Sequence, residues 1–108
     1  MKLLFVCSRN KERSPTAEKT FDGFDGHLAR SAGTDKKATN SLTLEMIEWA
    51  DLVFVMEKHH RNKIHKLLGS KFDPKKIINL EISDDYDCMD HNLIYELKLK
   101  VLPYLRVR

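Results

Sequence analysis

The sequence has little of several residue types on which special architectures depend. Its 108 residues include two cysteines, four glycines and three prolines, too few for a disulfide framework or a collagen-like repeat. Leu52–Met56, as long as any apolar run in the chain, has five residues, far short of the roughly 18 that indicate a membrane span. Apolar residues make up 42% of the chain and charged residues 32%, an ordinary balance for a soluble globular protein.

The net charge is small. The chain carries 19 basic and 16 acidic residues, a net charge of +3, which is too mild to indicate a nucleic-acid-binding protein. The apolar segment Met1–Cys7 resembles the start of a secretion signal, but charged residues from Arg9 onward interrupt it before a hydrophobic region forms. We therefore expect one domain, residues 1–108, that is cytoplasmic and monomeric, has reduced thiols and binds neither nucleic acid nor membrane.

Short apolar runs alternate with amphipathic stretches along the chain. The runs are predicted as buried strands: Leu3–Val6, Leu28–Ala32, Leu52–Met56 and Ile77–Leu80. Helices are predicted from Pro15 to about Phe24 with Ser14 as cap, from Asn40 or Ser41 to Ala50, from about Lys58 to Leu68, and from about His91, after Asp90 as cap, to Pro103, which should end or kink the helix. This alternation predicts an α/β fold: an open four-stranded parallel sheet of order 2-1-3-4 with helices on both faces.

The segment Lys58–Lys66 is locally basic. Charge runs of this kind usually form the solvated face of a helix. We expect its charged residues and its two adjacent histidines, His59 and His60, on the solvent side. The residues expected against the core are Ile64, Leu67 and Leu68.

The segment after the first predicted strand carries the strongest functional signal. Ligands of open parallel sheets bind beyond the carboxyl ends of the strands where the strand order reverses, and the chain leaves the first strand there at Cys7. A loop that curls into a helix N-terminus aims backbone N–H groups and the positive end of the helix dipole at one point, which binds a phosphate dianion and stabilises a thiolate. Arg13 can bind two phosphoryl oxygens at once, and Ser14 can donate a hydrogen bond to sulfur. This pattern indicates attack of the Cys7 sulfur on phosphorus and a cysteinyl-phosphate intermediate.

The segment Val6–Pro15 resembles the phosphate-binding loop of the low-molecular-weight protein tyrosine phosphatases. The resemblance continues at Ser31–Thr34, at Ala50–Glu57 and in the Asp-rich loop that begins at Asp84. It implies the fold of that family, with Cys7 as nucleophile. Residues 8–14 would then bind the phosphoryl group, with Asn10 bracing the turn: Ser8, Arg9, Asn10, Lys11, Glu12, Arg13 and Ser14.

The resemblance also implies a general acid. In the family this is an aspartate in a late loop, just before a proline and an aromatic residue. Asp84 is the best match, with Asp85 in the place of the proline and Tyr86 as the aromatic residue. Asp85 is the alternative acid, because a loop without proline leaves the register open and geometry decides between candidates. Tyr86 could form a wall of the substrate site or pack inside the protein.

Three features depart from the family pattern. Arg9 replaces a glycine, Glu12 replaces a second cysteine, and the stretch between Thr34 and Ala50 is short. The resemblance implies a phosphomonoesterase that acts on phosphotyrosine proteins or small aryl phosphates and needs no metal or organic cofactor, since Arg13 and oriented amides meet the charge. One alternative is a non-catalytic phosphate- or phosphoprotein-binding domain derived from the enzyme. A thiol-dependent arsenate reductase is a weaker alternative, because no relay of cysteines can be assembled.

Overall fold

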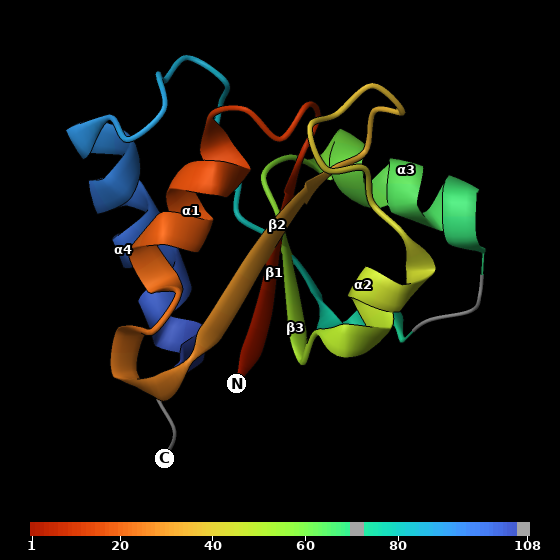
Figure 1. Cartoon of the computed structure of the whole chain (residues 1–108), viewed down its shortest axis with the longest axis horizontal. Coiled ribbons are helices and arrows are strands. Elements are labelled where there is room, and N and C mark those ends of the chain that lie inside the picture. The colour runs from red at the N-terminus through yellow and green to blue at the C-terminus, as the bar shows by residue number, and fades with distance from the viewer. Residues whose placement is uncertain (70–72, 106–108) are drawn as a thin grey trace.

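Parallel strands and α-helices alternate along the chain (Figure 1), within residues 1–69 and 73–105, which the computed structural model describes. The strands are β1 (Lys2–Cys7), β2 (Leu28–Gly33), β3 (Leu52–Val55) and β4 (Ile77–Asn79). The α-helices are α1 (Arg13–Phe21), α2 (Leu44–Trp49), α3 (Lys58–Leu68) and α4 (His91–Leu105), and two short 3-10 turns are η1 (Phe24–Gly26) and η2 (Pro74–Lys76). Among these residues, no helix has both the length and the apolar composition that crossing a bilayer requires.

The strands form one sheet in the order β2-β1-β3-β4, and every pairing is parallel. This confirms the predicted fold class and strand order. In the register of the sheet, Phe5 of β1 lies beside Ser31 on one side and Phe54 on the other. The order reverses between β1 and β3, so the loops that leave these two strands open a crevice at the carboxyl edge.

Helices cover both faces of the sheet, because successive side chains of a buried strand point in opposite directions. Leu3, Phe5 and Cys7 of β1 face the core under α1 and α4. Leu4 and Val6 face the core under α2 and α3. Figure 1 shows the two helix pairs on opposite sides of the sheet. Cys7 therefore ends a strand that is buried from Leu3 onward, and it is itself only 3% exposed.

The two helices that follow β1 and β2 begin at other residues than the pattern predicts. Helix α1 starts at Arg13, and Ser14 is not its cap because the Ser14 hydroxyl is turned toward the Cys7 sulfur. Helix α2 starts at Leu44, where the Thr43 hydroxyl accepts the Met46 N–H at 3.3 Å. The residues before Thr43 extend the edge of the sheet instead, through a bridge between Gly33 and Ser41.

Two further predictions about helices are wrong in part. Pro103 lies inside α4 and does not end it, since the helix continues to Leu105; a kink at Pro103, the other alternative, stays a prediction. The carbonyl that loses its partner belongs to Leu99, whose side chain is 57% exposed, so water can reach this side of the helix. In α3, Ile64 is fully buried as predicted, but Leu67 is 54% exposed.

The core on one face of the sheet contains a stack of three aromatic rings from β1, α1 and β3. The Phe5 ring packs between those of Phe21 and Phe54, with centroids 5.6 Å and 5.2 Å apart, and Phe5 is fully buried.

We expect Phe5→Ala to lower the free energy of unfolding by about 3–5 kcal/mol, because it removes apolar area and leaves a cavity. Urea unfolding measures this loss. Tyr95→Ala, at a residue 66% exposed, should change the free energy of unfolding by no more than about 0.5 kcal/mol, and equal effects of the two variants would contradict the packing of Phe5.

Candidate active site

A pocket of about 180 Å³ opens at the carboxyl edge of the sheet, between the loop that joins β1 to α1 and the loop that follows β4. It is smaller than the pockets that enclose whole drug-sized ligands, so it suits a small group such as a phosphoryl. Asp84 reaches it from a segment distant in sequence. The lining residues are Cys7, Ser8, Arg9, Lys11, Glu12, Arg13 and Asp84.

The Cys7 sulfur is held by hydrogen-bond donors from the turn around it. Its Sγ lies 2.9 Å from the Ser14 hydroxyl, and the Asn10 backbone N–H points to it at 3.3 Å. Asn10 has φ 59°, a left-handed conformation that asparagine tolerates better than most residues. Its side-chain amide donates to the Ser14 hydroxyl at 2.8 Å. The hydroxyl hydrogen of Ser14 has two acceptors within reach, the Cys7 sulfur at 2.9 Å and the Ala32 carbonyl at 3.4 Å, and the shorter contact is the one to the sulfur.

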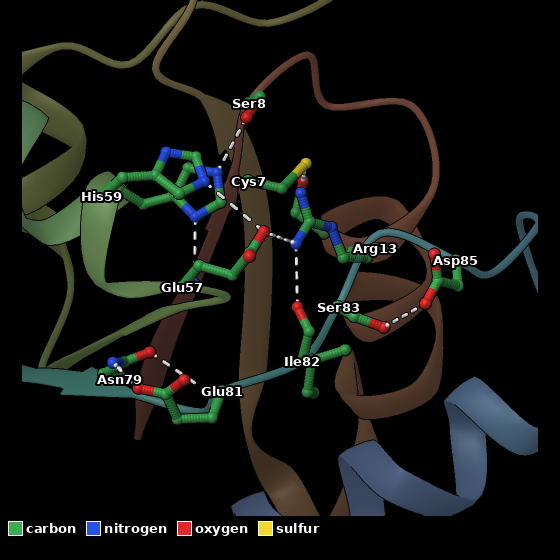
Figure 2. A network of polar contacts seen from close by, with 12 residues as sticks. Cys7, Ser8, Arg13, Glu57, His59, Asn79, Glu81, Ile82, Ser83 and Asp85 are labelled. Carbon is green, nitrogen blue, oxygen red and sulfur yellow. Dashed lines mark hydrogen bonds and ion pairs between the residues drawn. The ribbon is translucent and has the colours of Figure 1, made fainter.

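Arg13 is almost entirely buried, with 5% exposure. Its Nη1 donates to the carboxylate of Glu57 at 2.5 Å and to the backbone carbonyl of Ile82 at 2.8 Å. Figure 2 shows the guanidinium between these two partners, close to Cys7. In residues 1–69 and 73–105, Nε and Nη2 have no hydrogen-bond partner, so one edge of the fork remains for the oxygens of an anion.

Glu57 fixes the orientation of this guanidinium. It lies just beyond β3, as the residue before α3. The hydrogen bond from Arg13 is the main cause that holds the pKa of Glu57 below its ordinary value, and the positive charge of Arg13 adds to it. A carboxyl with a lowered pKa stays ionised as the pH falls, so the pair with Arg13 persists into mildly acidic solution.

The buried histidine of α3, His60, binds the loop of residues 8–12 between β1 and α1, which we call the pocket loop. The prediction that His60 lies on the surface is wrong. His60 is fully buried. Its Nδ1 accepts the Glu57 N–H at 3.0 Å, as in a capping box. Nε2 therefore carries the proton and donates to the Ser8 hydroxyl at 2.9 Å. Ser8, which Figure 2 labels beside Cys7, is the first residue after the nucleophile candidate.

The two candidate acids, Asp84 and Asp85, have different positions in the loop after β4. Asp84 lines the pocket, whereas the Asp85 carboxylate accepts the Ser83 hydroxyl at 3.1 Å and does not line it. Tyr86 packs against the apolar cluster under α4 and donates its hydroxyl to Glu96 at 2.6 Å. The second cysteine, Cys88, is exposed.

The loop that follows β2 braces the pocket loop from the other side. The Thr34 and Asp35 N–H groups donate to the carbonyls of Cys7 and Ser8, each at 2.9 Å. A Cβ on Gly33 would lie 2.5 Å from the Ser8 carbonyl oxygen, closer than real contacts allow, so glycine is required for this approach. The two loops therefore share backbone hydrogen bonds and a tight contact.

One cluster of side chains in the described segments could hold a metal ion: Glu57, His59 and His60, whose donor atoms lie within 4.8 Å of one another. The Glu57 carboxylate is already bound to Arg13, and both nitrogens of the His60 ring have protein partners. An ion at this cluster would have to displace contacts that hold the pocket together.

Solved structures resemble this chain over almost its whole length. YwlE arginine phosphatase, as a cysteine-to-serine mutant with a phosphorylated active-site serine, is 24% identical with a TM-score of 0.75, and the match covers 100% of this chain and 98% of that one. The low-molecular-weight protein tyrosine phosphatase of Streptococcus pyogenes is 18% identical with a TM-score of 0.76, covering 96% and 90%. The tyrosine phosphatase Wzb of Escherichia coli K30, in complex with phosphate, is 18% identical with a TM-score of 0.75, covering 95% and 94%. The chain has the fold of the low-molecular-weight protein tyrosine phosphatases. No family model matches the sequence, and no curated protein is significantly similar to it.

Besides Asp84, two residues outside the pocket loop, Glu57 and His60, support the site. The sequence pattern alone did not predict them as site residues. Glu57 and His60 follow β3, whose carboxyl end lies beside that of β1. A signal was available: charged and titratable residues just after a central strand reach the same sheet edge as Cys7. The basic composition of α3 concealed it, because the pattern of a solvated helix also accounts for these residues.

The burial of His60 predicts a specific dependence of stability on pH. Burial is the main cause that lowers the pKa of His60 to about 3, whereas in the unfolded chain a histidine titrates near 6.5. Between these values the unfolded chain binds a proton that the folded chain does not, so stability falls as the pH falls through this range. From pH 7 to pH 5, wild type should lose about 2 kcal/mol more free energy of unfolding than His60→Gln, which cannot titrate.

Urea unfolding at the two pH values measures this difference. The range from pH 5 to pH 7 lies above the pH at which the carboxyl groups with a lowered pKa titrate. His91→Gln, at an exposed histidine at the start of α4, is the matched control, and it should follow wild type. An identical pH dependence in wild type and His60→Gln would show that His60 is not kept neutral by burial.

Proposed function

We propose that this chain is a cysteine-dependent phosphomonoesterase that acts on aryl phosphates, with phosphotyrosine proteins as its substrate class. The observation that carries the proposal is the meeting of Cys7, Arg13 and Asp84 around one small pocket. A nucleophile, an anion-binding fork and an acid are the groups that phosphoryl transfer through a covalent intermediate needs.

In the first step, the Cys7 thiolate attacks phosphorus and the bond from phosphorus to the leaving oxygen breaks. Arg13 binds the phosphoryl oxygens through its free edge, and the N–H groups of the pocket loop complete the cradle. Asp84, as the carboxylic acid, gives its proton to the leaving phenolate oxygen. The products are a cysteinyl phosphate, a phenol and an ionised Asp84.

In the second step, water attacks the phosphorus of the cysteinyl phosphate and the sulfur leaves as a thiolate. The ionised Asp84 takes the proton of the water and returns to its acid form. The Ser14 hydroxyl lies 2.9 Å from the sulfur and stabilises the negative charge that returns to it. Inorganic phosphate is released, and no metal or organic cofactor takes part.

The two alternative functions, phosphate binding without catalysis and arsenate reduction, do not account for all of the residues at the pocket. A domain that only binds phosphate needs neither a nucleophile beside the anion nor an acid opposite it. An arsenate reductase needs cysteines that relay a disulfide, but the chain has only Cys88 besides Cys7. Both rivals therefore leave Asp84 without a role.

The choice of an aryl phosphate rests on the resemblance of the loop Val6–Pro15 to that of the tyrosine phosphatases. The similar proteins of this fold include phosphatases of tyrosine and of arginine. The pocket of this chain carries charges of both signs, with Arg9, Lys11 and Arg13 against Glu12 and Asp84, so a phosphoarginine peptide is the comparison substrate.

The chemical roles can be tested on para-nitrophenyl phosphate without added metal. Cys7→Ser should abolish turnover, because a serine hydroxyl is a far weaker nucleophile than a thiolate. Asp84→Asn should lower kcat by about 10²-fold or more, since the amide cannot donate the proton. Asp85→Asn is the control and should retain near wild-type kcat. The release of para-nitrophenolate measures all of these rates.

Three outcomes would change the proposal. A larger loss in Asp85→Asn than in Asp84→Asn would exchange the roles of the two aspartates. A folded but inactive wild type that binds phosphate or vanadate tightly would indicate the binding domain. Neither activity nor anion binding would mean that the pocket has no phosphoryl chemistry.

The anion-binding role of Arg13 predicts a linked pair of effects. Arg13→Lys should lower kcat/KM by about 10²-fold and weaken inhibition by phosphate, because an ammonium cannot supply two parallel donors. Glu57→Gln should change both quantities in the same direction but less, since the amide oxygen can still accept from Arg13. Glu81→Gln, at an exposed residue that contacts Asn79, is the control. An unchanged rate in Arg13→Lys would remove Arg13 from the site.

A further inference from the structure

A second pocket lies beside the first, between the loop that follows β2 and helix α3. Its volume is about 570 Å³, larger than that of the first pocket. Lysines dominate its lining, and it contains a single carboxylate. The lining residues are Thr34, Asp35, Lys36, Lys37, Lys63, Lys66 and Leu67. We call it the lysine pocket.

The ammonium groups of this pocket are not used by the protein itself. Lys36, Lys37, Lys63 and Lys66 are all exposed, and within the described ranges none of their ammonium groups has a hydrogen bond or an ion pair. Other lysines of the chain are engaged: the Nζ of Lys76 donates to two carbonyls of the α2 end at 2.6 and 2.9 Å. The four lysines therefore present unpaired positive charge around one hollow.

Asp35 offsets only part of this charge. Its carboxylate accepts the Lys37 backbone N–H at 2.9 Å, and this hydrogen bond is the main cause that lowers the pKa of Asp35. The charges of Lys63, Arg9 and Lys37 lower the pKa further, so the electrostatic potential at Asp35 is positive. Four lysines against one carboxylate leave a strongly positive pocket.

The loop that lines the lysine pocket is hydrogen-bonded to the loop of the candidate active site. Its loop donates backbone hydrogen bonds to Cys7, Ser8 and Arg9, through the N–H groups of Thr34, Asp35 and Thr39. Arg9 lines the first pocket, and its charge reaches Asp35 in the second. Figure 1 shows the loop after β2 beside the loop between β1 and α1, above the start of α3. A polypeptide bound at Cys7 can therefore extend into the lysine pocket.

We propose that the lysine pocket binds acidic side chains of the protein substrate, at positions near the phosphorylated residue. The proposal rests on the proposed function and adds a preference for acidic sequences to it. Carboxylates complement the four unpaired ammonium groups, and the exposed Leu67 offers apolar contact to the stems of the acidic side chains. A nucleic acid fits less well, because no aromatic side chain lines the pocket for bases to stack on.

Two phosphotyrosine peptides test this preference. They differ only at the positions flanking the phosphotyrosine, which are glutamate in one and glutamine in the other. Wild type should hydrolyse the glutamate peptide with a kcat/KM about three- to ten-fold higher, since each exposed ion pair contributes modestly. The ratio should fall toward one as salt is added, because exposed charges are screened.

The variant Lys63→Gln/Lys66→Gln should lose most of this preference and retain wild-type hydrolysis of para-nitrophenyl phosphate, which is too small to reach the lysine pocket. Lys19→Gln/Lys98→Gln removes the same charge from exposed positions on α1 and α4, under the opposite face of the sheet. This control should keep the preference. Equal loss in both double variants would assign the effect to net charge and overturn the proposal.

Binding to Cys7→Ser separates this proposal from the proposed function. If para-nitrophenyl phosphate is hydrolysed but the two peptides are equivalent in rate and in affinity, the lysine pocket is not a substrate site and the phosphatase remains. If wild type is inactive, tighter binding of the glutamate peptide to Cys7→Ser, lost in Lys63→Gln/Lys66→Gln, would support the pocket and reject the enzyme. Equal affinities in an inactive protein would reject both.

Discussion

A buried guanidinium beside a thiol is the constraint on which the arrangement of this structure depends. Arg13 is 5% exposed, and a charge removed from water in this way is strongly unfavourable unless a partner compensates it. Glu57 and the Ile82 carbonyl supply that compensation at one nitrogen. These partners follow β3 and β4, while Cys7 ends β1. A parallel sheet brings those strand ends to one edge. The fold can therefore bury the guanidinium of Arg13 with partners at Nη1 and leave the N–H donors of Nε and Nη2 for an anion.

The contacts around Arg13 continue into a closed ring. Arg13 binds the side chain of Glu57, the backbone of Glu57 binds His60, and His60 binds Ser8 in the same loop that leads to Arg13. Each hydrogen bond in such a ring orients the next one. Both ends of the pocket loop are thereby fixed to the first turn of α3, which prepares the site for an anion before one binds.

The fold was predictable because its signals are local. Each buried strand is a short apolar run, and four runs separated by amphipathic stretches leave few topologies for a parallel sheet. Cys7 and Arg13 were predictable for the same reason, since one loop holds both. Glu57 and His60 were not, because their partners lie 44 and 52 residues away in the chain. A histidine on a basic helix has the same local pattern whether it faces solvent or a serine of another loop.

The two pockets differ in how firmly their side chains are tied to the rest of the protein, and this difference has an evolutionary consequence. The pocket loop at Cys7 cannot change freely, because its side chains also bear the buried charge and the strained turn at Asn10. Within residues 1–69 and 73–105, the ammonium groups of the four lysines around the lysine pocket have no hydrogen bond or ion pair, so exchanging these lysines breaks none there. Proteins tolerate substitutions that leave stability above its threshold. If the lysine pocket selects substrates as we propose, surface exchanges alone could redirect the partners of this chain and leave the buried contacts around Arg13 unchanged.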